Sequence, residues 1–394
     1  MKVSRYAWLG VSAMVLLAGC KGFWDATTTT TGGGSGTDAA SGVFYVLNAQ
    51  TNQVVGYQFA ANSNGPSAVT GASATLAALP YTMAVTPAGS FLYVSTVAGI
   101  YVYSIGSGGT LTIANGGAVI SQDAAFAMKV DSTGTWLVEV VSGLGTVNAV
   151  PISASSGLLD TTRTEKTAAL PTVTISQLAV SPANSTNPYV FVATGSGGTA
   201  VVPFTATNAD PFGTVSNIKA LNTAGGANAV AVDPSNRLLY VGETVAITAT
   251  ATQPQTGGLR VFTIGANSTI TEVSGSPFPT GGTGPSSILG GTLDVYVANK
   301  AVSGSTDGNI TAFSIVASGT TYSLTAINTV PAGLSTISIT ADSTAGYLLA
   351  VNSGGSPDLS TFTFDATTAG KLDASATATT GTDPVNAVAV VAIP

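Results

Sequence analysis

Side chains able to carry acid–base chemistry are few in this sequence. Histidine is absent, which removes the usual general base, the commonest metal ligand and the partner of a serine nucleophile. Carboxylates can replace histidine in proton transfer, so Glu139 and Glu243 are the candidate catalytic bases. Lys129 is a third candidate, because a lysine within an apolar segment is costly unless it is paired or meets a ligand. These residue types favour a non-catalytic protein, with catalysis by a carboxylate as the alternative.

The single cysteine, Cys20, follows a basic start and an apolar run over residues 6–18. The run is too short to span a bilayer as a helix, and residues 1–19 have the order of a secretory signal. The four residues ending in Cys20 resemble the lipobox of bacterial lipoproteins, and this resemblance implies that Cys20 carries lipid and becomes the first mature residue. A signal peptide with a chance cysteine is the alternative. Lys21 after the cysteine, rather than aspartate, favours the outer membrane.

Residues 20–41 are rich in threonine and glycine and hold few bulky apolar side chains. Such a segment cannot bury enough surface to offset the entropy of ordering it. We expect a flexible tether that links the lipid on Cys20, and hence the membrane, to a folded domain over residues 42–394.

Composition and charge narrow the class of that domain. Valine, threonine and glycine are abundant, which is typical of an all-β protein with short strands and tight turns. Removal of residues 1–19 leaves nine basic residues against eighteen acidic ones. This balance is a poor fit to nucleic acid, whose binding needs clustered lysine and arginine. The sequence also predicts no cofactor and no metal.

A pattern of an apolar strand, a turn and a second apolar strand recurs about every fifty residues. The second strand of each unit is marked, in order, by Tyr45, Tyr93, Val138, Phe191, Tyr240, Tyr296 and Leu349. A third and a weaker fourth strand follow in each unit. Four antiparallel strands in seven units predict a seven-bladed β-propeller.

The two ends of residues 42–394 each hold an incomplete unit. Residues 42–48, "GVFYVLN", form a second strand without a first strand before it, and residues 386–394, "NAVAVVAIP", form a first strand without a second after it. Pairing of the two would complete one blade, close the ring and remove free sheet edges.

The predicted ring of blades indicates where most of the candidate residues should lie. Lys129 lies in a first strand and Glu139 in the second strand of the same unit, so we expect an ion pair between them; alternatively, Lys129 points into the central channel toward an acidic ligand. Loops on a rigid scaffold commonly carry binding. The positions where second strands end should surround one mouth of the channel, and they are Asn48, Thr96, Thr194, Glu243, Asn299, Lys300 and Asn352.

Two of the loops that follow second strands are long, at residues 244–257 and 300–308. Asp131, Asp233 and Asp342 recur instead at the turn between first and second strands. There they are expected to bind the backbone of the turn rather than a metal or a substrate.

The turn "VDPSNRLLYV" at 232–241, the strand "LRVFTI" at 259–264 and the segment "GSPFPTG" at 275–281 resemble the seven-bladed lactonase propeller family. That family includes 6-phosphogluconolactonase-type proteins, so the resemblance implies the fold and, as one possibility, lactone hydrolysis. Catalytic proposals for the family use histidine, glutamate and arginine near the central channel. The sequence has no histidine, and Arg237 and Arg260 fall in a turn and an outer strand, so no catalytic set carries over.

Together these observations predict a lipid-anchored, monomeric β-propeller of the bacterial cell envelope. We expect it to bind an envelope protein or a glycan on the face with the long loops. The alternative is a hydrolase of a sugar-derived lactone that uses Glu243 or Glu139 as its base.

Overall fold

The computed structural model describes residues 42–61, 65–141, 143–172, 174–183, 185–222, 224–247, 255–265, 269–354, 357–378 and 386–394. The predicted signal sequence, Cys20 and the tether at 20–41 lie outside the described residues. Within the described ranges no helix is long and apolar enough to cross a bilayer.

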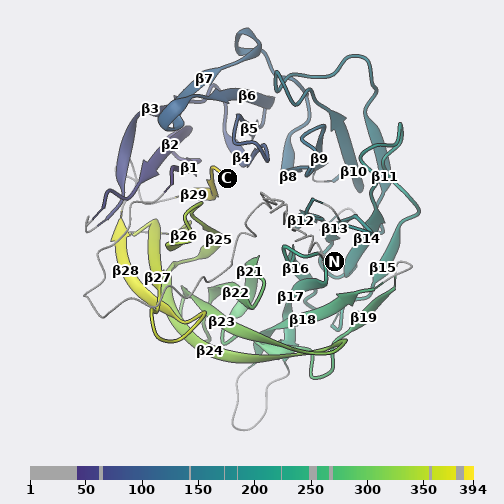
Figure 1. The fold of residues 1–394 in the computed structure, drawn as a ribbon, viewed down its shortest axis with the longest axis vertical. Coiled ribbons are helices and arrows are strands. Elements are labelled where there is room, and N and C mark those ends of the chain that lie inside the picture. Colours follow the sequence, from purple (N-terminus) through teal and green to yellow (C-terminus); the bar gives the residue numbers. More distant parts are fainter. Residues whose placement is uncertain are drawn as a thin grey trace, which may run out of the picture.

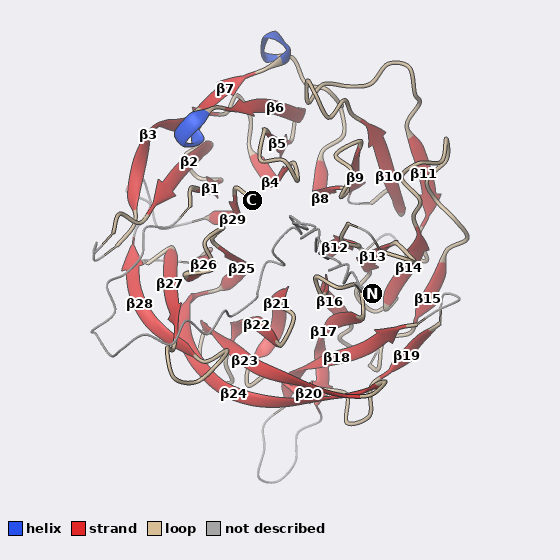
Figure 2. Ribbon diagram, viewed as in Figure 1, coloured by secondary structure: helices blue, strands red, loops and turns tan. Residues whose placement is uncertain are grey.

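The described chain forms seven antiparallel sheets arranged as blades around a central axis, and nearly all its regular structure is strand (Figures 1 and 2). In each blade the first strand is innermost and the fourth is outermost. Blade one joins β29 (Ala387–Ala392), β1 (Phe44–Asn48), β2 (Gln53–Gln58) and β3 (Ser67–Thr75). Blade two holds β4 (Pro80–Val85), β5 (Phe91–Thr96), β6 (Gly99–Ile105) and β7 (Leu111–Ile113). Blade three holds β8 (Ala125–Val130), β9 (Trp136–Val141), β10 (Thr146–Pro151) and β11 (Lys166–Ala169).

The remaining four blades follow the same order along the chain. Blade four holds β12 (Gln177–Val180), β13 (Tyr189–Ala193), β14 (Thr199–Pro203) and β15 (Ser216–Ile218). Blade five holds β16 (Ala227–Val232), β17 (Leu238–Ile247), β18 (Thr256–Ile264) and β19 (Ile270–Glu272), with β20 (Phe278–Pro279) also paired to β18. Blade six holds β21 (Thr283–Gly290), β22 (Asp294–Ala301), β23 (Asp307–Ser318) and β24 (Thr321–Leu334). Blade seven holds β25 (Thr336–Ala341), β26 (Tyr347–Asn352), β27 (Leu359–Phe364) and β28 (Leu372–Ala378).

The predicted closure of the ring is confirmed. Strand β29 pairs antiparallel with β1, and Phe44 faces Ala392 while Leu47 faces Ala389. Both ends of the described chain therefore belong to one sheet, as the incomplete units at 42–48 and 386–394 predict.

The alternation of strands defines two faces of the ring. Turns between second and third strands, and the connections between blades, lie on one side, which we name the upper face. Turns between first and second strands lie on the other side, which we name the lower face. Gly42 emerges on the lower face, where its backbone NH donates to Asp342 of a lower turn at 3.4 Å.

Burial follows strand position. The second strands β1, β5, β13 and β26 are buried at every residue, because they lie between two strands of their own sheet and two neighbouring blades. The first strands are partly exposed, for example β8 at Phe126 and Lys129. Apolar clusters join one blade to the next; one of them combines Tyr93 of blade two with Leu137 of blade three. Packing between blades thus holds the ring together.

Asp131, Asp233 and Asp342 occupy equivalent lower turns, and their predicted structural role is confirmed. The Asp131 carboxylate accepts from the backbone NH of Thr133 at 2.9 Å, of Thr135 at 2.8 Å and of Trp136 at 2.7 Å. These bonds satisfy donors that the tight turn would otherwise leave unpaired.

Polar side chains also link neighbouring first strands around the axis. Gln177 accepts a hydrogen bond from the NH of Val230 at 2.9 Å, one blade further on. Two equivalent bonds run to Ser287 and Ser338 from the NH groups of Ile339 and Val390. These bonds fix the height of each first strand against the next.

Candidate functional site

A cavity within the described residues opens on the upper face between blades six and seven. Its volume is about 420 Å³, and its walls are mainly apolar. Residues of both blades line it, including Thr283, Lys300, Ala301, Thr306, Leu334, Ser335 and Gly354. Of the predicted binding residues, Lys300 alone lines this cavity. We name it the blade six–seven pocket.

Lys300 lies near the upper end of β22, and its side chain is exposed. None of the ion pairs between described residues involves its amine. Ser335, on the opposite wall, has a positive φ of 56° and connects β24 to β25. The pocket therefore offers one cationic group beside an apolar surface.

The loops predicted at 244–257 and 300–308 are shorter than expected. Strand β17 continues to Ile247, which pairs with Thr256 of β18, and Lys300 and Ala301 belong to β22. Residues 248–254 lie outside the described ranges. Two hairpins longer than those of the other blades thus replace the expected loops.

The other second-strand termini are buried within their turns. Asn48 accepts hydrogen bonds from the NH groups of Gln50 and Thr51 at 3.0 and 3.2 Å. The Thr96 and Thr194 hydroxyls each donate to a glycine carbonyl of the following turn at 2.9 Å. These polar groups stabilise the turns between second and third strands. Their role in binding stays a prediction that the geometry does not support.

Asn299 and Asn352 are likewise fully buried in polar networks. The Asn299 amide donates to the Thr280 carbonyl at 2.9 Å and to the Asn309 side chain at 2.7 Å. Asn352 accepts from the Thr336 hydroxyl at 2.8 Å. Thr336 and Asn352 face each other in register on β25 and β26, so Asn352 joins the first and second strands of blade seven.

Glu243, one of the candidate bases, belongs to a buried charge network. One of its carboxylate oxygens lies 2.8 Å from the Arg260 guanidinium, and the other accepts from the NH of Leu221 at 2.9 Å. Arg260 also binds both oxygens of Glu272, at 2.8 and 2.7 Å. Burial acts to raise the pKa of Glu272, but hydrogen bonds from Arg260 and Ser276 outweigh it and hold that pKa below its usual value. Glu243 is thus occupied in linking blades four and five and is not placed to accept a proton from a substrate.

The expected ion pair between Lys129 and Glu139 does not form. Lys129 faces Val138 in the register of β8 and β9, whereas Glu139 faces Met128. Residues adjacent along a strand point to opposite faces of the sheet, so the two charges lie on opposite sides of blade three.

Lys129 is solvent-accessible on β8, which borders the centre of the ring (Figure 1). The surrounding protein lowers the pKa of its amine by desolvation. The alternative placement, near the channel and away from Glu139, is therefore the one that the geometry favours.

Glu139 is fully buried on the side of blade three that packs against blade two. Its carboxyl group lies within reach of the Asp123 and Asn148 side chains, although neither of its oxygens meets a donor in ordinary geometry among the described residues. Burial raises its pKa to about 9, and the nearby carboxylates of Asp123 and Glu165 add to this rise. The acid is consequently protonated at neutral pH, and it can donate a proton but not accept one there.

A second cavity lies beside this carboxyl group, at the outer boundary of blades two and three. Its volume is about 300 Å³. It is lined by Ile120, Ser121, Gln122, Asp123, Val150, Pro151, Leu159, Arg163 and Glu165. We name it the acidic cleft.

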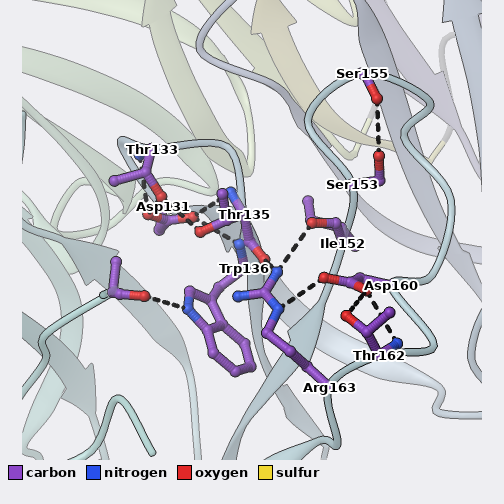
Figure 3. A network of polar contacts seen from close by, with 11 residues as sticks. Asp131, Thr133, Thr135, Trp136, Ile152, Ser153, Ser155, Asp160, Thr162 and Arg163 are labelled. Atoms are coloured by element: carbon purple, nitrogen blue, oxygen red, sulfur yellow. Dashed lines mark hydrogen bonds and ion pairs between the residues drawn. The ribbon is translucent and has the colours of Figure 1, made fainter. Parts of the chain in front are cut away.

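Arg163, on the wall of the acidic cleft, is held by its own network (Figure 3). Its guanidinium donates to Asp160 at 2.8 Å and to the carbonyls of Thr135 and Ile152 at 2.8 and 3.2 Å. It also lies over the Trp136 ring, 4.4 Å from the centroid. Most of its donors are therefore already used within blade three.

The sequence interpretation singled out Glu139 but missed its neighbours. Asp123 lies in the connection before β8, and Glu165 lies in the long segment between β10 and β11. No motif marks either residue, and only the spacing of acidic residues around Glu139 could have suggested the group. Within the described ranges no group of three histidine, cysteine, aspartate or glutamate side chains is arranged to hold a metal ion.

The fold defines the class of this protein: it is a seven-bladed β-propeller. Solved structures with the same architecture include a candidate 6-phosphogluconolactonase from Bacteroides uniformis, at 13% identity and a TM-score of 0.65, covering 89% of this chain and 99% of that one. A candidate 6-phosphogluconolactonase from Bacteroides fragilis has 12% identity and a TM-score of 0.64, covering 91% and 99%. The periplasmic gluconolactonase PpgL of Pseudomonas aeruginosa has 14% identity and a TM-score of 0.62, covering 90% and 100%.

The particular fold is thus that of lactonase-type propellers, as the sequence resemblance predicts. No protein-family model and no curated protein sequence matches the chain. At these identities the likeness establishes the fold and not the activity.

Proposed function

We propose that this protein is a lipid-anchored propeller of the bacterial envelope that binds a partner at the blade six–seven pocket. The observation that carries the proposal is the Lys300 amine, which forms no ion pair with the described residues and lies at the edge of an apolar cavity of about 420 Å³ on the upper face. A concave apolar site with a few polar groups is the usual form of a binding site.

The chemistry of the pocket favours a protein partner over a glycan. Apolar walls such as Leu334 and Ala301 suit apolar side chains, and a sugar would need more hydrogen-bond partners than this lining supplies. Lys300 would pair with an acidic side chain of the partner. Pairing in a partly desolvated pocket gives specificity as well as affinity.

The absence of an assembled catalytic set supports a binding role. The sequence has no histidine, and Glu243 is bound to Arg260. Neither Glu139 nor Lys129 lines the blade six–seven pocket. Among the described lining residues Lys300 is the one ionisable side chain, with no second group placed beside it for catalysis, which suits a pocket that holds a partner rather than converting a substrate.

Charge reversal at the pocket tests the proposal. The immobilised protein is exposed to envelope extract, and captured proteins are compared between wild type, Lys300→Glu and the control Lys166→Glu, which changes a lysine of blade three. We expect a specific protein to be captured by wild type and by Lys166→Glu and lost with Lys300→Glu. Equal capture by all three would reject the pocket as the binding site.

The anchor is tested separately. Cells expressing wild type or Cys20→Ser are labelled with a fatty-acid analogue and fractionated. Lipidation predicts label and outer-membrane association for wild type, and their loss for Cys20→Ser. An unlabelled wild-type protein would refute the anchor without affecting the pocket.

Lactone hydrolysis is the second candidate, favoured by the likeness in fold to structures named as lactonases. An uncharged or sugar-derived lactone suits the acidic protein better than a phosphorylated one. Purified protein is assayed with glucono-δ-lactone, together with Glu139→Gln and Glu243→Gln. Turnover that either substitution abolishes would replace the binding proposal by a hydrolase.

A further inference from the structure

Lys129 is the one charged residue in the seven described first strands, which surround the axis of the ring (Figure 1). Its amine belongs to none of the ion pairs between described residues. The side chain is accessible to solvent, yet the surrounding protein desolvates it and so lowers its pKa. Both properties are expected of a side chain near the centre of a ring of strands.

The neighbouring first strands supply no counter-charge to Lys129. The strand registers place an uncharged residue at the same level on each of the other first strands. These residues are Ala84, Ala179, Ala231, Leu289, Thr340 and Val391. A protein with more acidic than basic residues thus holds an isolated cation at its centre. An isolated charge in a desolvated place is stabilised by a partner of opposite charge.

A repeated irregularity of the first strands is a second, independent feature. In six blades the register between first and second strands shifts near the upper end, and one extra residue is inserted in the first strand. Such bulges redirect a side chain away from the regular pleat. The inserted residues are Val388, Tyr81, Phe126, Asn228, Ser286 and Ile337, and all of them are at least partly exposed.

The two polar inserted residues are used within the ring. Asn228 of blade five donates to the carbonyl of Pro285 in blade six at 2.7 Å. Ser286 of blade six donates to the carbonyl of Thr336 in blade seven at 2.7 Å. These side chains therefore connect one first strand to the next.

The four apolar or aromatic inserted residues lie on consecutive blades. Ile337, Val388, Tyr81 and Phe126 belong in turn to blades seven, one, two and three, and we name them the apolar arc. The rings of Tyr81 and Phe126 lie 6.4 Å apart, and Phe126 is 47% exposed. The apolar arc thus presents an apolar surface beside the axis, above Lys129.

We propose that the centre of the ring binds a carboxylate carried on a short apolar chain, with the carboxylate at Lys129 and the chain against the apolar arc. A lysine amine and a carboxylate form a strong, charge-assisted hydrogen bond. A strand rises about 3.3 Å per residue, so Phe126 and Lys129, three positions apart on β8, are separated by about 10 Å, which suits a chain of about six carbons. An apolar surface with one polar group that fixes orientation is typical of small-molecule sites.

An apolar acid fits this arrangement better than a sugar acid or a phosphate. The hydroxyl groups of a sugar acid would lose their hydrogen bonds to water against the apolar arc. A phosphate is usually held by several donors, whereas Lys129 is the one cation on the first strands. The ligand class is therefore an aliphatic or aromatic monocarboxylate.

The test is calorimetric titration of the full protein with hexanoate. Gluconate, which carries hydroxyl groups on a chain of the same carbon number, and 1-hexanol, which lacks the charge, are the comparison ligands. We expect saturable binding of hexanoate, with both comparison ligands bound about tenfold more weakly or less tightly still.

Variants separate the charge from the apolar arc. Lys129→Gln should weaken hexanoate about tenfold or more, and Phe126→Ala should weaken it about threefold or more. Lys166→Gln is the matched control, because Lys166 lies on β11, the outermost strand of the same blade. Lys300→Glu should also leave hexanoate binding unchanged, so this result does not depend on the blade six–seven pocket.

The C-terminal residue of a partner protein can carry the same pair of groups. A short peptide that ends in leucine separates the sources: tighter binding of the peptide than of hexanoate assigns the site to a protein terminus, and the reverse assigns it to a free acid. Absence of saturable binding of both, gluconate or 1-hexanol bound as tightly as hexanoate, or equal weakening by Lys166→Gln and Lys129→Gln would each overturn the proposal.

Discussion

Replacement of Glu139 by glutamine should stabilise the protein, increasingly so as the pH rises. Glu139 is fully buried, and burial raises its pKa from 4.5 to about 9. The folded state therefore keeps the proton at pH values where the unfolded chain has lost it. Because the folded state binds more protons, the free energy of unfolding falls as the pH rises from about 4.5 to about 9. Glutamine has nearly the same shape and cannot ionise, so Glu139→Gln removes this loss.

The magnitude follows from the size of the pKa shift. For each pH unit above 4.5, the free energy of unfolding of the wild type falls by about 1.4 kcal/mol, until the pH reaches the pKa of Glu139 in the folded state. At pH 7 the gain from Glu139→Gln should be about 3 kcal/mol, and near pH 5 it should be less than about 1 kcal/mol. The glutamine amide can also donate to Asp123, as the protonated acid does.

Urea unfolding at pH 5, 6, 7 and 8 measures the effect through the fluorescence of buried Trp136. The difference between the variant and the wild type should grow with pH. Asp210→Asn is the control, since this exposed acid in blade four lies away from Glu139 and should change stability little. A difference that is constant between pH 5 and pH 8, or destabilisation by glutamine at pH 8, would refute the reasoning.

Three further perturbations address other parts of the fold, each measured by urea or thermal unfolding. Glu243→Gln should lower the free energy of unfolding by about 2 kcal/mol, because Arg260 loses a charged partner in a buried site. An unchanged unfolding midpoint would contradict the structural role of Glu243. Asp131→Ala should cost about 3 kcal/mol through the loss of its backbone hydrogen bonds, and Asp210→Ala, an exposed control, should cost far less. Deletion of Ala387–Pro394 should yield oligomers in size-exclusion chromatography, because it exposes the edge of β1; a monomer with unchanged stability would argue against the closure.

The sequence was sufficient for the architecture because each blade repeats a local pattern. Apolar second strands such as 44–48 and 91–96 are continuous runs, and the aspartates of the lower turns recur at fixed positions. The split blade also follows from the pattern, since two incomplete units can satisfy each other's edges. These features depend on residues close together in the sequence, or on the match between the two incomplete units.

The arrangement around Glu139 was not predictable in the same way. The expected pairing with Lys129 depends on strand register, and an offset of one residue moves a side chain to the other face of the sheet. The irregularity between Ala125 and Ala127 contributes to that register and has no signature in the sequence. Asp123 and Glu165 reach Glu139 through connections whose path depends on packing between two blades.

The predicted ring of binding residues stays a prediction, and most of its side chains are buried for another reason. Polar residues that end a second strand face the interior of their own turn, and Asn299 and Asn352 satisfy neighbouring strands and loops there. Sequence position shows where a strand ends but not whether the side chain turns inward. Lys300, one residue beyond Asn299, points to the opposite side and lines the pocket.

The shared sheet of β1 and β29 also sets an order of assembly. The residues that complete the sheet begun at Phe44 are synthesised more than three hundred positions later, so this blade cannot form while the chain is still emerging. Six of the sheets can form from segments that are close in sequence, whereas the seventh keeps an unpaired edge until its last strand has been synthesised. Folding of the ring is therefore expected to finish after synthesis, and any exported chain would pass through the membrane before its circle is closed.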